Sequence, residues 1–308
     1  MLALVAAPRS PGGLELREVD EPIPAADEAV VEVEAVSLNR SDVNAVRSAP
    51  DGTRGGWDLA GIVATAAADG TGPREGAQVV GLIPGGAWAQ RVAVPTGYLA
   101  PIPDALAATA AAAMPAAGLT ALHTLYVGGL IDGKRVLVTG AAGGVGRFAV
   151  QIAAHSGAIV TAVVASEERG AGLRDLGAEH VSIGLPGEGE YELILESIGG
   201  ESLARALGSV APGGCVVSFG CSSGEATTFD GPTFSSRHAA RLFGFLLFDE
   251  LQRTGSAVHD LVNLADQLAT GRLDAQIGLE LEWADAARAV DALLERRLVG
   301  KAVLRVEQ

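Results

Sequence analysis

A glycine-rich turn near the middle of the chain constrains the fold more than any other segment. An apolar run at residues 136–138 leads into this turn, residues 139–146, and an apolar helical pattern then continues to Gly157. The turn fits the spacing G-x-G-x-x-G when Ala141 takes the first position and Gly143 and Gly146 take the second and third. A second apolar run, Ile159–Val164, supplies the next strand.

Strand, glycine turn, helix and strand in this order form the unit with which a Rossmann fold binds the pyrophosphate of a dinucleotide. Glycines let the backbone approach the phosphates, and the helix N-terminus offers N–H groups and a partial positive charge. The alternative is a plain strand–turn–helix unit of another α/β protein. Because turn, helix and second strand all follow in the required order, we predict that this segment binds a dinucleotide.

The flanking patterns predict an α/β chain with two domains. Residues 1–105 hold short apolar runs punctuated by Gly, Pro and Asp, which is typical of a β-barrel-like domain. From residue 136 apolar runs alternate with helical patterns, including a helix at residues 167–176, and predict a doubly wound parallel sheet that ends with an apolar strand at residues 241–248. Between the domains Pro115 should break one helix and Gly118 should begin another. The tail, which ends in a strand at residues 302–306, should return to the first domain.

Composition excludes several classes of function. The 308 residues are 48% hydrophobic, enough for a large core, and the net charge of −15 disfavours nucleic acid and anionic membranes as partners. Two cysteines exclude a disulfide framework and a four-cysteine zinc lobe, and they fit a reducing cytosol. The sequence has no apolar stretch long enough for a membrane span and no secretory signal, so we expect a cytoplasmic protein.

Several segments of the chain, taken together and in order, have a specific pattern. They are Ser37-Leu38-Asn39-x-x-Asp42, Gly56-Trp57-Asp58-Leu59-Ala60-Gly61, Val79-Val80-Gly81-Leu82, Gly86-Ala87-Trp88-Ala89-Gln90, Gly118-Leu119-Thr120-Ala121, the glycine turn, Ser166-Glu167-Glu168-Arg169 and Gly300-Lys301-Ala302-Val303-Leu304. With these segments the chain resembles the zinc-free quinone oxidoreductase and enoyl reductase branch of the medium-chain dehydrogenase/reductase superfamily. The resemblance implies a GroES-like β-rich catalytic domain at residues 1–115 and 248–308 and a Rossmann domain at residues 116–247. It also implies a homodimer that pairs the edge strands of two nucleotide domains, with residues 241–248 as that edge.

Departures from the superfamily pattern determine the expected chemistry. Zinc-dependent alcohol dehydrogenases of this superfamily carry Cys where this chain has Asn39 and Gly-His-Glu where it has Gly56-Trp57-Asp58. Neither Asn nor Trp suits a catalytic zinc ion here, so we expect no metal. Related quinone reductases often have tyrosines near Asn44 and Gly184, and the loop between residues 46 and 56 is short in this chain. These changes leave the substrate pocket open to interpretation.

The end of the second Rossmann strand favours NADPH over NADH. NAD-specific proteins place there a carboxylate that would repel a 2′-phosphate, whereas this strand is followed by Ala165 and Ser166. Ser166 leaves room for the phosphate and can donate to it, and Arg169 can add a charge-assisted contact. Two alternatives stay open: Glu167 binds the ribose, or Ser166 only caps the next helix.

The remaining site residues follow from the resemblance and from their place at strand ends. Asn39 is expected to donate to the substrate oxygen or the cofactor ribose, or else to be a turn-forming amide. Trp57 is expected to form an apolar pocket wall, or else to be a core residue, and Asp42 to cap a helix or pair with Arg40. His123 is expected to be a core histidine. The expected cofactor-binding set is Thr120, Ala142, Gly143, Gly144, Val145, Gly146, Ser166, Arg169, Gly220, Cys221 and Phe245.

These expectations define one main function and two alternatives. The main function is that of an NADPH-dependent reductase, which transfers hydride to a small apolar electrophile, either a quinone or an α,β-unsaturated carbonyl, with the proton coming from solvent or a ribose hydroxyl. One alternative is a pathway-specific enoyl reductase acting on thioesters. The other alternative is a catalytically idle NADPH-binding protein. The fold does not choose among them.

Overall fold

The computed structural model describes residues 1–187 and 190–307, which divide into two compact units. One unit comprises Met1–Leu119 and Leu251–Gln308, and the other comprises Thr120–Glu250. The chain passes from one unit to the other within two helices, α3 (Pro115–Tyr126) and α7 (Leu247–Thr254).

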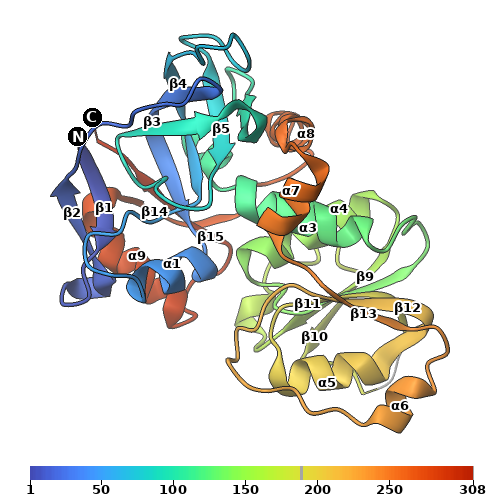
Figure 1. Ribbon diagram of the computed structural model, residues 1–308. Coiled ribbons are helices and arrows are strands. Elements are labelled where there is room, and N and C mark those ends of the chain that lie inside the picture. Colours follow the sequence, from blue (N-terminus) through green and yellow to red (C-terminus); the bar gives the residue numbers. More distant parts are fainter. Residues whose placement is uncertain (188–189, 308) are drawn as a thin grey trace. The chain divides into compact units, whose positions relative to one another are not determined.

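The first unit is built on two sheets whose strands pair antiparallel, except for one parallel pair, β14 and β15 (Figure 1). Strands β1 (Leu2–Ala6) and β2 (Leu14–Glu18) form a hairpin-like pair. A seven-stranded sheet has the order β14-β15-β3-β4-β5-β7, with β6 also paired to β3. Its strands are β3 (Glu28–Leu38), β4 (Asp58–Thr65), β5 (Gln78–Leu82), β6 (Arg91–Pro95), β7 (Leu99–Pro101), β14 (Ile277–Glu282) and β15 (Lys301–Arg305).

The C-terminal strand of the chain completes this sheet. Ala302 of β15 lies opposite Leu38 of β3 in antiparallel register. Strand side chains alternate between the two faces of a sheet. The apolar residues on one face of β3 and β15 therefore pack into one buried core together with Trp88 and Trp283. The helical segments of this unit are η1 (Pro11–Gly13), α1 (Arg40–Arg47), η2 (Thr96–Tyr98), α2 (Ala108–Ala112), α8 (Val258–Ala269), η4 (Trp283–Asp285) and α9 (Ala286–Leu294).

The second unit is a six-stranded parallel sheet in the order β10-β9-β8-β11-β12-β13. Chain order runs outward from β8 in both directions, so right-handed crossovers place α4 and α5 on opposite faces of the sheet (Figure 1). This is the predicted doubly wound arrangement. Its elements are β8 (Arg135–Val138), α4 (Gly144–His155), β9 (Ile159–Val164), η3 (Glu168–Gly170), β10 (His180–Ile183), β11 (Tyr191–Glu196), α5 (Gly200–Ser209), β12 (Val210–Ser218), α6 (Gly231–Ser235) and β13 (Arg241–Gly244).

Three local expectations are wrong. The helix expected at residues 167–176 is only the short turn η3, because it ends at Gly170 and Gly172 then adopts φ +76°. The apolar run 241–248 is not one strand: β13 ends at Gly244, and α7 begins at Leu247 with one buried face. The helix break expected at Pro115 is present, since α2 ends at Ala112, but the next helix begins at Pro115 and not at Gly118, because proline fits the first turn of a helix.

Membrane insertion is not indicated by the helices of the described residues. Within residues 1–187 and 190–307, none of them has both the length and the hydropathy that a membrane span needs.

Candidate functional site

The carboxyl ends of β8 and β11 mark the topological switch point of the parallel sheet. Chain order reverses between these two strands, and such sheets bind ligands in the crevice outside the strand ends at that point. The loop after β8 contains the glycine turn, and the loop after β11 contains Ser197, Ile198 and Gly199. The strand order therefore places the predicted dinucleotide loop at the crevice of the sheet.

Glycine is required at two positions of the turn for different physical reasons. Gly140 adopts φ +60°, and its carbonyl accepts a hydrogen bond of 2.9 Å from the Gly143 N–H. A Cβ on Gly146 would lie 2.5 Å from the Gly140 oxygen, so only glycine lets α4 pack this closely on the turn. The sequence fit gave the first position to Ala141, but the residue that makes the tight bend is Gly140. Its place directly after Thr139 at the strand end was the available signal.

The N-terminus of α4 has the features of a phosphate-binding site. Gly143 is the N-cap residue with extended backbone, and no described side chain caps this end of the helix. The first-turn N–H groups of Gly144, Val145 and Gly146 have no partner inside the helix, because intrahelical bonds begin one turn later. Ala142 is buried, while Gly143 to Val145 are half-buried. These residues fit the pyrophosphate of a dinucleotide.

The loop after β9 places Ser166 and Arg169 together, both half-buried. The Ser166 hydroxyl donates to the exposed Glu168 carboxylate, and this bond lowers the pKa of Glu168 below its ordinary value. Ser166 is therefore not the N-cap of η3, which begins after Glu167 without a side-chain cap. A phosphate that takes the Ser166 hydroxyl would have to displace only an exposed carboxylate.

Arg147 is a cation beside this loop that the sequence did not single out. It is the fourth residue of α4 and is 6% exposed, and its Nη2 donates to the Ala171 carbonyl at 2.6 Å. The α4 segment and the loop after β9 are thereby joined through a guanidinium. An arginine within an apolar helix was visible in the sequence, but its partner 24 residues away was not.

The loops after β11 and β12 meet at Ser197. A Cβ on Gly220 would lie 3.0 Å from the Ser197 oxygen, and one on Gly199 would lie 2.6 Å from the sulfur of Cys221. Cys221 is an exposed free thiol. Phe245 follows β13 at the same edge, is buried, and donates its N–H to the Ser218 oxygen at 2.9 Å. The structure therefore brings the predicted residues Gly220, Cys221 and Phe245 to the carboxyl edge of the sheet.

Helix α3 holds two further residues of interest. Thr120 is half-buried, and its carbonyl accepts a bond of 2.7 Å from the Thr124 hydroxyl. His123 is 5% exposed, and its Nδ1 lies 3.9 Å from Oε1 of Glu250. Its burial agrees with the interpretation as a core histidine.

Asn39 lies in the first unit, at the centre of a buried polar cluster. Its Nδ2 donates to Asp42 at 3.0 Å and to Asp58 at 2.8 Å, and its Oδ1 accepts from Lys301 Nζ at 2.6 Å. Both amide hydrogens and the amide oxygen are thus engaged inside the protein. These contacts are those of the turn-forming amide that was the alternative interpretation, and a catalytic role for Asn39 stays a prediction.

Asp42 has the capping role expected of it. The Asn39 N–H donates to its Oδ1 at 2.8 Å, and the two residues form a capping box at the start of α1. Burial first, and then the charge of Asp58, raises the pKa of Asp42 to about 7. Arg40, the other expected partner, donates to the Leu293 carbonyl at 2.6 Å.

Asp58 and Lys301 are members of this cluster that sequence reasoning missed. Asp58 is fully buried and accepts from the Ser37 hydroxyl at 2.6 Å and from the Ala116 N–H at 2.8 Å. Lys301 Nζ lies 3.5 Å from the same carboxylate. A lysine inside the apolar run of β15 was the only sequence signal, because its partners are distant in the chain.

Trp57 and Trp88 differ in exposure. Trp57 is half-buried, and its carbonyl accepts from the Ile83 N–H at 2.9 Å. Trp88 is fully buried and donates its indole N–H to the Ser37 carbonyl at 3.1 Å. The core tryptophan of this region is therefore Trp88, which leaves Trp57 partly accessible.

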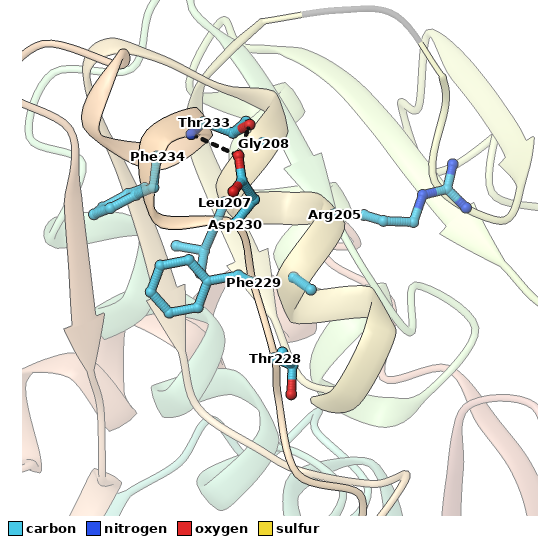
Figure 2. Close-up of a pocket in the computed structure, with 9 residues that line it drawn as sticks. Arg205, Leu207, Gly208, Thr228, Phe229, Asp230, Thr233 and Phe234 are labelled. Atoms are coloured by element: carbon cyan, nitrogen blue, oxygen red, sulfur yellow. Dashed lines mark hydrogen bonds between the residues drawn. The ribbon is translucent and has the colours of Figure 1, made fainter.

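A shallow cavity of about 190 Å³ lies elsewhere on the second unit (Figure 2). It lies along the later turns of α5 and beside α6, where the Asp230 carboxylate accepts from the Thr233 N–H at 2.9 Å. Phe229 and Phe234 line it and meet edge to face. None of the predicted site residues lines this cavity.

Comparisons with known proteins agree with both units. Residues 25–104 match the family model of the alcohol dehydrogenase GroES-like domain, and residues 144–263 match that of zinc-binding dehydrogenases. A mycobacterial protein solved in complex with NADPH has 26% identity, covers 99% of this chain and 100% of its own, and has a TM-score of 0.88. A quinone oxidoreductase of Pseudomonas syringae has 27% identity over 99% of each chain and a TM-score of 0.84.

Curated relatives are similar over different shares of their length. Prostaglandin reductase-3 of Bos taurus is 29% identical over 94% of this chain and 84% of its own. The first curated relatives are polyketide synthases, and the chain spans only 8–14% of their length. Together the two family models, the strand order of the parallel sheet and the full-length structural matches show that this chain belongs to the medium-chain dehydrogenase/reductase superfamily.

Proposed function

We propose that this chain is an NADPH-dependent oxidoreductase that transfers hydride to a quinone or an α,β-unsaturated carbonyl without a metal ion. The observation that carries the proposal is the N-terminus of α4, which has no side-chain cap and lies within the Gly140–Gly146 turn at the switch point of the sheet. NADPH, when bound, supplies the hydride. The solved NADPH complex and the quinone oxidoreductase among the similar structures support this assignment.

The chain's own residues define what the site contributes. The α4 N–H groups bind the pyrophosphate, and the loops that meet at Ser197 shape the half of the crevice beside β11 and β12. Ser166 and Arg169 bind the 2′-phosphate, because no carboxylate ends β9. Asn39 and Trp57 are the proposed substrate-side residues. Since the Asn39 amide is engaged by Asp42, Asp58 and Lys301, we assign it an aligning role and no proton transfer.

Residue types support the proposal of metal-independent chemistry. Asn39 and Trp57 stand where zinc-dependent relatives carry ligands, and no group of three or more His, Cys, Asp or Glu residues is arranged to hold a metal within the part of the chain that the structure describes. Chelator treatment should therefore leave turnover unchanged.

Cofactor preference is tested by titrating NADPH and NADH separately by fluorescence. We expect tighter binding of NADPH, and Arg169→Ala should weaken NADPH about tenfold while changing NADH little, since a charge-assisted phosphate contact is lost. Arg174→Ala is the matched control, because this exposed guanidinium donates to the Glu179 carbonyl. Equal affinity for the two cofactors in the wild-type protein would refute the preference.

A substrate panel separates the functional alternatives. NADPH oxidation is followed with quinones, enones and enoyl thioesters, with and without chelator. The similarity to a segment of polyketide synthases is the reason to include enoyl thioesters in the panel, and turnover restricted to thioesters would select the thioester alternative. NADPH binding with no turnover of any of the three would select the idle binding protein.

A further inference from the structure

Glu196 is a buried carboxylate at the switch point that has no part in the proposed chemistry so far. It is the last residue of β11 and is fully buried. Its Oε1 accepts from the Ile198 N–H at 3.0 Å and the Ser202 hydroxyl at 2.9 Å, and its Oε2 accepts from the Gly199 N–H at 3.0 Å. One side chain thus holds the loop after β11 and the first turn of α5.

The same carboxylate reaches across to the loop that precedes the glycine turn. Thr139 Oγ1 lies 3.3 Å from Glu196 Oε1 and accepts from the Ser197 N–H at 3.0 Å. Thr139 comes directly after β8 and directly before the Gly140 bend. The two loops on either side of the switch point are therefore joined through Glu196 and Thr139.

Backbone contacts make this junction sensitive to small shifts. A Cβ on Gly140 would lie 2.7 Å from the Ser197 hydroxyl, and a Cβ on Gly220 would lie 3.0 Å from the Ser197 carbonyl oxygen. The loops after β8, β11 and β12 thus converge on Ser197, the residue next to Glu196. A movement of Ser197 would change the shape of all three loops.

We propose that Glu196 is a positioning residue that fixes the loops around the nicotinamide half of the dinucleotide crevice. The inference rests on the proposed dinucleotide function. In a sheet with this strand order the adenosine half of the ligand lies beside the first three strands and the other half beside the last three. Glu196 joins the loop after β8 to the loops after the last three strands. A change at Glu196 should therefore alter the binding of the pyrophosphate and nicotinamide half and not that of the adenosine half.

The carboxylate is needed here because it only accepts hydrogen bonds. Two backbone N–H groups and the Ser202 hydroxyl donate to its two oxygens, and the Thr139 hydroxyl lies 3.3 Å from both Oε1 and the Leu195 carbonyl oxygen. A glutamine here would replace one carboxylate oxygen with an NH₂ group, which cannot accept a hydrogen bond. At least one of the donors that now faces that oxygen, such as a buried backbone N–H, would lose its partner. Glu196→Gln keeps the shape of the side chain but must therefore displace the loop at Ile198 and Gly199.

The test measures two ligands on the full chain by calorimetric titration. NADPH reports on the whole crevice, and adenosine 2′-monophosphate, which has no 5′-phosphate, reports on its adenosine half alone. We expect Glu196→Gln to weaken NADPH about tenfold or more and to change the affinity for adenosine 2′-monophosphate less than about twofold. A general loss of folding would weaken both ligands alike, so the ratio of the two effects distinguishes positioning from stability.

Two further variants complete the experiment. Glu192→Gln is the matched control, because Glu192 lies on the same strand and accepts from the Arg135 side chain at 2.7 Å, before the carboxyl end. It should leave both affinities unchanged. Thr139→Val removes the hydroxyl that joins the loops, keeps the side-chain shape, and should reproduce the selective loss of NADPH even if Glu196→Gln does not fold.

Each result has a defined meaning. If Glu196→Gln and Thr139→Val both bind NADPH like the wild-type protein, the positioning role is wrong while the proposed function stands. The same holds if both variants lose affinity for the two ligands to the same extent. If the wild-type protein binds neither ligand, the proposed function itself is wrong. A selective loss of NADPH in Thr139→Val, with Glu192→Gln unaffected, supports the inference.

Discussion

At the scale of single residues, Gly56 is a position that no side chain can occupy. Its φ is +91°, and a Cβ there would lie 2.1 Å from Cδ1 of Trp88. Trp88 is fully buried and hydrogen-bonded, so its ring has no space into which to move. The segment before β4 therefore depends on a glycine for both its backbone conformation and its packing.

Gly56→Ala should lower the free energy of unfolding by about 2–4 kcal/mol, from the sum of backbone strain and overpacking. The measurement is the urea midpoint of unfolding. Gly52→Ala is the matched control: its φ of +84° is similar, but nothing lies within 4 Å of the added Cβ. The control should lose only about 1 kcal/mol, and equal losses in the two variants would contradict the packing argument.

Some residue roles were predictable because their partners are close in the chain. The two residues of the Asn39–Asp42 capping box are only three positions apart, and the sequence favours it directly. Asp58 and Lys301 were missed because a strand pairing across the whole chain brings them together. Glu196 was missed for a related reason: its burial follows from the loops that cover it, and Thr139 lies 57 residues away.

At the scale of elements, β13 is the exposed edge of the parallel sheet. It pairs on one side with β12, and its residues Leu242 and Phe243 are 47% and 42% exposed. An apolar edge strand with free backbone groups favours pairing with a second copy. We propose that two chains pair through this edge.

Phe243→Lys should convert the dimer to a monomer, since a charged side chain on an edge strand opposes pairing. Light scattering at micromolar concentration measures the mass of each variant. Ile23→Lys is the control, because Ile23 is 94% exposed and lies in the other unit. A wild-type protein that is monomeric would remove the basis of the proposal.

Elements were predictable where apolar period and punctuation agree. The strand, glycine turn, helix and strand from β8 to β9 follow the sequence pattern closely. The expected helix at residues 167–176 failed because its apolar positions did not reveal the effect of Gly170 and Gly172 on the backbone. The prediction of one strand from Arg241 to Phe248 was wrong for another reason: the apolar residues of a strand and of a helix look alike over so few positions.

At the scale of the whole molecule, the fold class was predictable and the domain boundaries stay a prediction. Alternation of strands and helices after residue 136 predicts the parallel sheet, and the six-stranded order confirms it. Boundaries after residues 115 and 247 were placed from the resemblance to the superfamily. In the structure the chain changes units inside α3 and α7, where an uninterrupted helix gives no sequence signal.

Asp42 should make the free energy of unfolding change with pH in the direction opposite to that produced by most carboxylates. Burial raises the pKa of Asp42 from 3.8 to about 7, so the unfolded chain ionises this group first as the pH rises. The free energy of unfolding therefore falls between about pH 4 and pH 7 and loses nothing further from this group above that range.

Asp42→Asn should flatten this part of the profile while keeping an oxygen that can cap α1. The urea midpoint should fall less between about pH 5 and pH 8 in the variant than in the wild-type protein. Asp69→Asn is the control: hydrogen bonds from Thr71 lower the pKa of this exposed carboxyl, so its titration lies below that range. Parallel profiles for wild type and Asp42→Asn would contradict the assignment.

The buried cluster around Asn39 also makes folding of this chain a proton-coupled reaction. Between the two pKa values of Asp42, the folded protein holds a proton that the unfolded chain gives up to the solvent. The buffer must take up that proton each time a molecule unfolds. The heat absorbed on unfolding near pH 6 therefore contains the ionisation enthalpy of the buffer, and differs between phosphate and an amine buffer although the protein itself is unchanged.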